Sequence, residues 1–186
     1  MGAATATSAS SNADGGASRP PDRAVSPGDG FFGSLVDEKR IFPDLAGATA
    51  SEVLTEMADG LARGGAVSDG EDAARRLIER ERMGSTGLGG GLAIPHCKLK
   101  ELSEVVLAVG ISRRGIDFFS SDGVPVTLVF LVLSPADAPA LHLQALARIS
   151  RVIRVPGIAE MLRQKRTPAE IAAVLKEADA HLAMPV

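Results

Sequence analysis

Residues 84–99 run Gly84-Ser85-Thr86-Gly87-Leu88-Gly89-Gly90-Gly91-Leu92-Ala93-Ile94-Pro95-His96-Cys97-Lys98-Leu99, a glycine-rich loop that leads into a short apolar strand ending on a histidine. Five glycines stand within residues 84–91. Glycine permits positive φ and close approach of the backbone, so such a loop is able to direct several N–H groups at a charged ligand. Pro95 has a fixed φ and limits how the following ring, His96, is presented. The stretch therefore predicts one imidazole beside an anion-binding loop.

Extended segments begin at the end of this loop and continue after it. Runs of β-branched and apolar residues, bounded by Gly, Pro or Asp, predict strands over residues 92–98, 105–112 and 124–133, with a short extended piece at 115–118. The longest apolar run, residues 126–133, is about a third of the ~20 residues that a membrane-spanning helix needs. We interpret it as a buried strand and expect no direct membrane insertion.

Helical periodicity occurs on both sides of the strands. Apolar residues at helical spacing predict helices over residues 49–62, 68–82 and 139–155, and another from 167 onward. We expect Ser51 to cap the first of these and Met83 to face inward at the end of the second. The last helix is expected to begin at Thr167 with a capping box closed by Glu170. Helices before, among and after several strands favour a layered α/β domain with a mixed sheet.

Composition fits one domain with an appendage. The chain has 186 residues, 45% of them hydrophobic, and a net charge of −3, which gives no electrostatic case for nucleic acid as a partner. It contains no Trp or Tyr and six Phe, so little is available to stack on bases. The single cysteine excludes a disulfide within the chain and suits a reducing cytoplasm.

The first 30 residues are small and polar, with Val25 the only branched aliphatic side chain. Such a segment cannot bury enough surface to offset its chain entropy, so a disordered Ala/Gly/Ser/Pro-rich tail is expected over residues 1–30. It lacks the apolar region of a secretory signal, and its three aspartates argue against a transit peptide. A plain linker and a docking arm remain alternative roles. Residues 31–178 are expected to form the domain, and residues 179–186 a C-terminal tail.

His96 is the candidate nucleophile. A single histidine near a strand end is often a packing or surface residue, but the adjoining glycines favour chemistry. Neutral imidazole is a good nucleophile near pH 7, and a hydrogen bond from its other nitrogen to a backbone carbonyl would select the tautomer. Transfer of an anionic group to such a ring needs mainly in-line positioning and charge neutralisation, part of which the loop amides of residues 84–91 would supply.

The string of residues 84–99 resembles the phosphorylation-site motif of the mannitol/fructose-type IIA proteins of the bacterial phosphotransferase system. Its Gly-Ser-Thr-Gly opening and Ala-Ile-Pro-His core are most similar to the fructose and nitrogen-regulatory branches. The resemblance covers residues 31–178 and implies a mixed sheet of about five strands with helices on both sides, the mannitol/fructose-type IIA fold. It also implies that His96 accepts a phosphoryl group on Nε2 from the phosphohistidine of the carrier protein HPr.

Two further site residues come from the same resemblance. Arg80 stands in an Arg80-Glu81 pair that is similar to the opening of the family motif, and its planar guanidinium would hold two phosphoryl oxygens. A solvated basic face is the alternative, given the arginines nearby. His142 lies in a segment similar to the element that supplies a second active-site histidine, where it would donate to phosphoryl oxygens or orient His96. A packed core histidine is its alternative.

Other chemistries fit less well. The three histidines and one cysteine are too few and too irregularly spaced for a zinc site, and we expect neither a metal nor a cofactor. Ser85 has no nucleophile-elbow context, and no Gly-Lys-Ser/Thr follows the glycines as a phosphate-binding P-loop requires. Cys97 follows the histidine where similar proteins often carry a small residue, and we expect it to pack.

The resemblance leaves two functional classes open for a cytoplasmic phosphotransferase component. A nitrogen-type regulator would bind target proteins according to its phosphorylation state. A sugar-uptake component would pass the phosphoryl group to a fructose- or mannitol-type IIB partner. The free-standing length and the Gly-Ser-Thr-Gly opening slightly favour the regulator.

Overall fold

The computed structural model describes residues 1–2 and 31–183. The predicted tail, residues 1–30, therefore falls outside the described residues except for its first two. The helical elements described are α1 Phe31–Leu35, the 3-10 turn η1 Glu38–Arg40, α2 Ala50–Arg63, α3 Gly70–Arg82, α4 Pro139–Val152, α5 Ile158–Gln164 and α6 Pro168–Ala183. The strands are β1 Ile41–Phe42, β2 Gly87–Gly89, β3 Leu92–Ala93, β4 His96–Leu99, β5 Val106–Ile116 and β6 Val126–Pro135.

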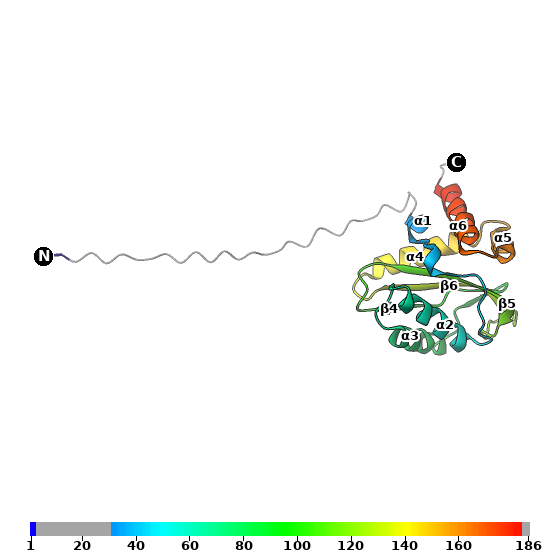
Figure 1. Cartoon of the computed structure of the whole chain (residues 1–186), viewed down its shortest axis with the longest axis horizontal. Coiled ribbons are helices and arrows are strands. Elements are labelled where there is room, and N and C mark those ends of the chain that lie inside the picture. The colour runs from blue at the N-terminus through cyan, green and yellow to red at the C-terminus, as the bar shows by residue number, and fades with distance from the viewer. Residues whose placement is uncertain (3–30, 184–186) are drawn as a thin grey trace.

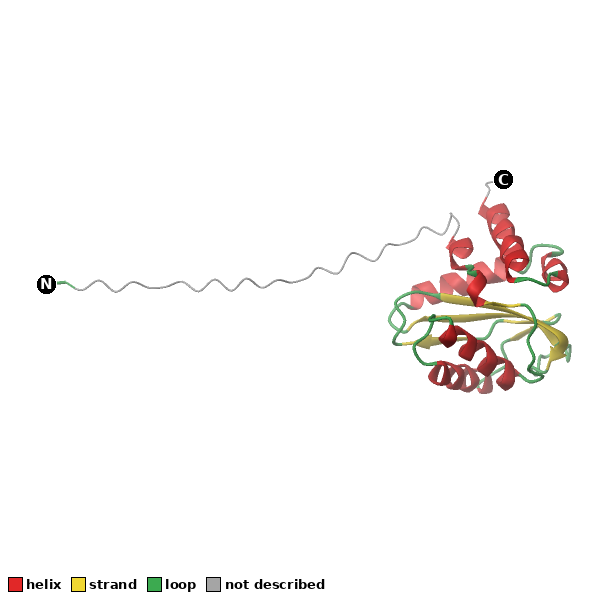
Figure 2. Cartoon of the chain, viewed as in Figure 1, coloured by secondary structure: helices red, strands yellow, loops and turns green. Residues whose placement is uncertain are grey.

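The strands form one mixed sheet between two helical layers. Its order is β1-β5-β6-β3-β2, and β4 continues beside β6 beyond β3. β5 and β6 are antiparallel, whereas β3 and β4 both run parallel to β6. Helices α2 and α3 cover one face, and α1, α4, α5 and α6 cover the other (Figures 1 and 2). The predicted α/β fold with helices on both sides is confirmed, with six described strands where about five were expected.

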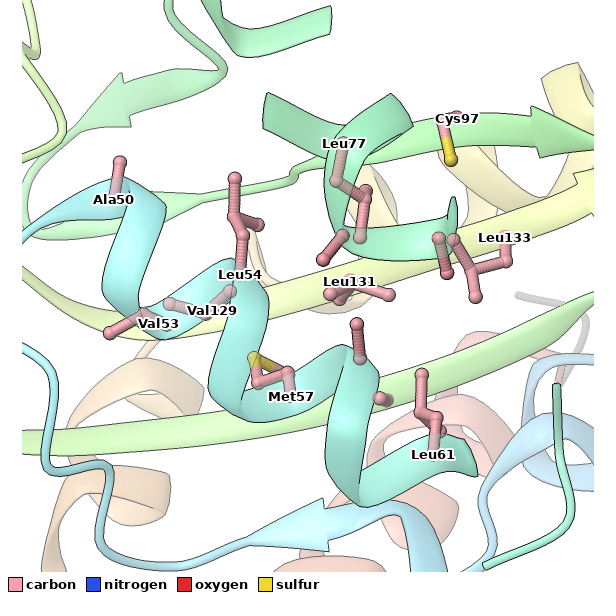
Figure 3. Packing of buried hydrophobic residues seen from close by; sticks show 14 of the residues in the cluster. Ala50, Val53, Leu54, Met57, Leu61, Leu77, Cys97, Val129, Leu131 and Leu133 are labelled. Atoms are coloured by element: carbon pink, nitrogen blue, oxygen red, sulfur yellow. The ribbon is translucent and has the colours of Figure 1, made fainter. Parts of the chain in front are cut away.

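The core lies on both faces of β6, which is why its sequence is apolar without interruption from Leu128 to Leu133. Side chains alternate between the faces: Val129, Leu131 and Leu133 pack under α2 and α3, as Figure 3 shows, whereas Phe130 and Val132 pack under the opposite helices. A strand covered on both faces needs no polar positions. The expectation of a buried strand here is confirmed, and no described helix is long and apolar enough to cross a membrane.

Helix starts follow local chemistry, with one correction. Thr49, and not Ser51, caps α2, because the Thr49 side chain accepts from the Glu52 N–H while the Glu52 carboxylate accepts from the Thr49 N–H. The same reciprocal capping box joins Thr167 and Glu170 at α6, as predicted. The prediction for Met83 is wrong: it is the residue after α3 ends and its side chain is 80% exposed.

Several boundaries also differ from the predictions. The strand expected at residues 92–98 is two strands, because Pro95 has no N–H to continue the ladder. The first half of the extended piece expected at 115–118 is the end of β5, which passes through an irregularity between Ile111 and Ile116. α5 was not predicted. α6 runs to Ala183, so residues 179–183 belong to the folded domain and not to the expected C-terminal tail.

Candidate active site

His96 begins β4 at the point where the chain leaves Pro95. It is the register partner of Val132 in β6. Side chains of β4 alternate, so Cys97 and Leu99 are buried beneath α3, whereas His96 is half-buried and Lys98 is exposed on the opposite face. The histidine and the cysteine thus lie on opposite sides of the sheet, as expected for adjacent strand residues. Burial raises the pKa of the Cys97 thiol to about 12, which leaves it unreactive.

The His96 ring is held by one backbone contact. Its Nδ1 lies 2.8 Å from the carbonyl oxygen of Ile94. A carbonyl only accepts, so Nδ1 carries the proton and the lone pair is on Nε2. The neutral ring therefore presents Nε2 as its nucleophilic atom.

His142 lies beside this ring. It is in the first turn of α4 and 8% exposed, and the centroids of the His96 and His142 rings are 5.4 Å apart with their planes at 57°. Burial lowers the pKa of His142, and repulsion by the Lys98 ammonium, and by the His96 ring whenever that ring is charged, lowers it further. The fold thus brings together two histidines that are 46 residues apart in sequence, and it favours the neutral form of the second one.

Arg80 lies in the last turn of α3 and reaches the start of the loop. Its Nη1 donates to the carbonyl oxygen of Gly84 at 2.9 Å. Gly87 pairs with Ala93 in the antiparallel β2–β3 ladder, and the Ile94 N–H donates to the Thr86 oxygen. The hydrogen bond that the structure gives Arg80 is therefore to the loop and not to either histidine.

Glu81 anchors the same loop and was missed in the sequence analysis. Its carboxylate accepts from the Thr86 N–H at 2.9 Å and from the Thr86 hydroxyl at 2.5 Å. Ser85 adds a second anchor, because its hydroxyl donates to the Phe118 carbonyl at 2.6 Å and accepts from the Gly87 N–H. The side chains of Arg80 and Glu81 thus both bind residues 84–86. The sequence feature that could have indicated the Glu81 contact is an acidic residue five positions before Thr86.

The three consecutive glycines form a tight turn. Gly89, Gly90 and Gly91 all have φ between 62° and 84°, in the left-handed region, and connect β2 to β3. The Gly90 N–H donates to Asp122 at 2.8 Å, and its carbonyl accepts from Arg163. Donation from the Gly90 and Val124 backbones lowers the pKa of the Asp122 carboxyl.

These contacts limit one expectation. The amides of Thr86, Gly87 and Gly90 all donate to acceptors within the protein, so these three are not directed at a bound anion. The expectation that the loop amides contribute to charge neutralisation stays a prediction for the other amides of residues 84–91. Within the described residues, no group of three or more His, Cys, Asp or Glu side chains is arranged to hold a metal ion.

Comparison with known proteins bears on this geometry. Residues 34–178 match the family model for the EIIA 2 domain of the phosphoenolpyruvate-dependent sugar phosphotransferase system. The chain belongs to this family. The match covers nearly all of the folded residues, and the two histidines, Arg80 and the glycine loop all lie within it.

Relatives of this EIIA protein include regulators and sugar-specific components. A nitrogen regulatory protein from Bradyrhizobium diazoefficiens is 41% identical over 143 residues, which is 76% of this chain and 92% of that protein. A fructose-specific EIIA component from Haloferax volcanii is 34% identical over 130 residues, 70% of this chain and 84% of that one. The crystal structure of the nitrogen regulatory protein IIA-Ntr from Neisseria meningitidis has a TM-score of 0.70 and 29% identity, covering 77% of this chain and 97% of that one. The predicted IIA fold, close to the nitrogen-regulatory branch, is confirmed.

Proposed function

We propose that this EIIA protein is a phosphocarrier that accepts a phosphoryl group on Nε2 of His96 from an HPr-type protein. The observation that carries the proposal is the bond between His96 Nδ1 and the Ile94 carbonyl, which leaves Nε2 unprotonated beside a second, neutral histidine. A nucleophile in this form needs no general base.

The transfer step balances without a proton acceptor. The Nε2 lone pair attacks phosphorus as the N–P bond of the donor phosphohistidine breaks, and the bonding electron pair leaves with the donor imidazole. Nδ1 of His96 keeps its proton, so the phosphorylated ring is cationic. A charged donor makes a stronger hydrogen bond, and the Ile94 carbonyl therefore stabilises the product more than the free enzyme.

Side chains would neutralise the transferring phosphoryl group. Arg80 at the loop would supply a planar guanidinium, and His142 an N–H donor, in accordance with the roles that the family resemblance implies. Lys98 adds a positive charge on the same face of β4 as His96. These roles for Arg80 and His142 stay predictions.

Labelling tests the acceptor. The protein, incubated with phosphoenolpyruvate, enzyme I and HPr, should gain one acid-labile, alkali-stable phosphoryl group by intact mass spectrometry. His96→Ala should lose this label. His181→Ala is the matched control, because His181 is exposed near the end of α6, and it should be labelled fully. Undiminished labelling of His96→Ala would contradict the assignment.

A regulatory role in the cytoplasm is the form of this function that we favour. It is supported by the higher identity to the Bradyrhizobium nitrogen regulatory protein than to the Haloferax fructose component. In the alternative, the phosphoryl group passes to a IIB partner during sugar uptake.

The two roles differ in what happens to the label. A regulator should retain phosphohistidine when an isolated fructose- or mannitol-type IIB protein and its sugar are added. Its target proteins should bind His96→Ala and the charge mimic His96→Asp differently in pull-downs. Rapid sugar-dependent loss of the label through IIB would instead establish the uptake role and leave the acceptor assignment intact.

A further inference from the structure

Ser134 contacts His142, the second histidine of the site, from the buried side. It lies in β6 and is fully buried, and its Oγ is 2.7 Å from Nδ1 of His142. Ser134 is the register partner of Lys98 and stands two residues beyond Val132, the partner of His96. His142 thus contacts both Ser134 of β6 and the ring of His96 of β4.

The direction of this hydrogen bond follows from the needs of the hydroxyl. Among the residues that the structure describes, His142 Nδ1 is the hydrogen-bond partner of Ser134 Oγ. If Nδ1 carried the proton and donated it, the buried hydroxyl hydrogen would be left without an acceptor, which is unfavourable. If the hydroxyl donates to Nδ1, both groups are satisfied. The hydroxyl is therefore the donor, and the proton of neutral His142 is on Nε2.

We propose that Ser134 is a positioning residue that holds His142 in the Nε2-protonated form, so that an N–H, and not a lone pair, faces the phosphoryl group on His96. This inference rests on the proposed phosphocarrier function. It assigns opposite forms to two adjacent rings: His96 has its proton on Nδ1 and His142 on Nε2.

The assignment explains how two neighbouring histidines avoid competing for the phosphoryl group. Nδ1 of His142 is occupied by the serine hydroxyl, and Nε2 is protonated, so neither nitrogen offers a free lone pair. The lowered pKa of His142 agrees with this arrangement, because a protonated ring could not accept from Ser134. His96 alone is then a nucleophile, and His142 is restricted to hydrogen-bond donation.

Nitrogen NMR of the histidine rings tests the tautomer directly. In the wild-type protein, the long-range correlations of His142 should show a protonated Nε2. In Ser134→Ala, Nδ1 loses its donor and the ring should become a mixture of tautomers. Phosphoryl transfer from phospho-HPr should slow by about three- to tenfold, the loss expected for one neutral buried hydrogen bond. Ser134→Thr keeps the hydroxyl and should restore both the tautomer and the rate.

Ser112→Ala is the matched control. Ser112 is another buried serine, in β5, and its hydroxyl accepts from the Gly115 N–H. No described hydrogen bond joins Ser112 to either histidine. This variant should leave the His142 tautomer and the transfer rate unchanged, which separates a specific effect from general loss of a buried hydroxyl.

Three results would overturn the inference. They are a protonated Nδ1 on His142 in the wild type, an unchanged tautomer in Ser134→Ala, or a slowed rate in Ser134→Ala that Ser112→Ala reproduces. Failure of the proposed function appears separately, as a wild-type protein that takes up no label. In that case the NMR tautomers alone decide whether Ser134 controls His142.

Discussion

Arg148 and Asp179 form a buried ion pair between α4 and α6. Nε of Arg148 lies 2.6 Å from Oδ1 of Asp179, and the two side chains are 9% and 2% exposed. The second carboxylate oxygen of Asp179 accepts from the Gly33 N–H in α1 at 2.9 Å. One aspartate thus joins three helices on the face of the sheet that carries His142.

Asp179→Asn should destabilise the protein by about 3–5 kcal/mol, because the guanidinium of Arg148 would remain buried without its counter-charge. Urea unfolding measures this loss. Glu177→Gln, at an exposed position on the same helix, is the control and should change the free energy of unfolding by less than about 0.5 kcal/mol. Equal effects of the two substitutions would show that the ion pair contributes nothing specific.

Glu81→Gln should loosen the loop that precedes β2. The amide keeps one acceptor but loses the charge that receives both Thr86 donors, so a cost of about 1–3 kcal/mol is expected. Hydrogen exchange of the Thr86 amide should accelerate in this variant. Glu79→Gln breaks only an exposed ion pair with Arg75 and should leave that amide protected.

Arg80→Lys should fold normally and transfer the phosphoryl group more slowly. Lysine keeps the positive charge but loses the bidentate geometry, and such a contact is commonly worth ~2–4 kcal/mol of barrier. Rapid-quench measurement of transfer from phospho-HPr gives the rate. Arg75→Lys, at an exposed position on the same helix, is the control. Equal rates in the two variants would indicate that Arg80 belongs to a solvated basic face and does not contact the phosphoryl group.

Cys97 makes the stability depend on alkaline pH. The pKa of its thiol is raised from 9.0 to about 12 in the folded protein, mainly by burial. Between these values the unfolded chain loses the thiol proton and the folded chain keeps it, so the free energy of unfolding should fall as pH rises above 9. Cys97→Ala should lack this component. The difference between the two proteins should be constant below pH 9, and a difference that stays constant up to pH 11 would contradict the burial effect.

Features that depend on residues close together in the chain were predicted correctly from the sequence. The capping box at Thr167 and the apolar run of β6 both depend on residues close in the chain, and both are confirmed. Ser51 was expected to cap α2, but the cap is Thr49, two residues earlier, because Thr49 makes the reciprocal contact with Glu52.

Long-range partners account for most of what was missed. The glycine amides were expected to face a ligand, but Asp122 takes the Gly90 N–H from 32 residues away, and no short-range pattern indicates that contact. Ser134 likewise contacts His142 only because β6 turns back into α4. The domain was expected to end at residue 178, whereas Asp179 is buried against Arg148, which lies on another helix.

The loop whose amides are engaged by Glu81, Ser85 and Asp122 has a consequence for selectivity. A ring of free backbone N–H groups would bind inorganic phosphate or sulfate regardless of any chemistry at His96. With these amides occupied, we expect free anions to bind weakly, so that retention of a phosphoryl group depends on forming a bond to nitrogen. The abundant phosphate of a cell would then be a poor competitor of the phosphorylated donor protein.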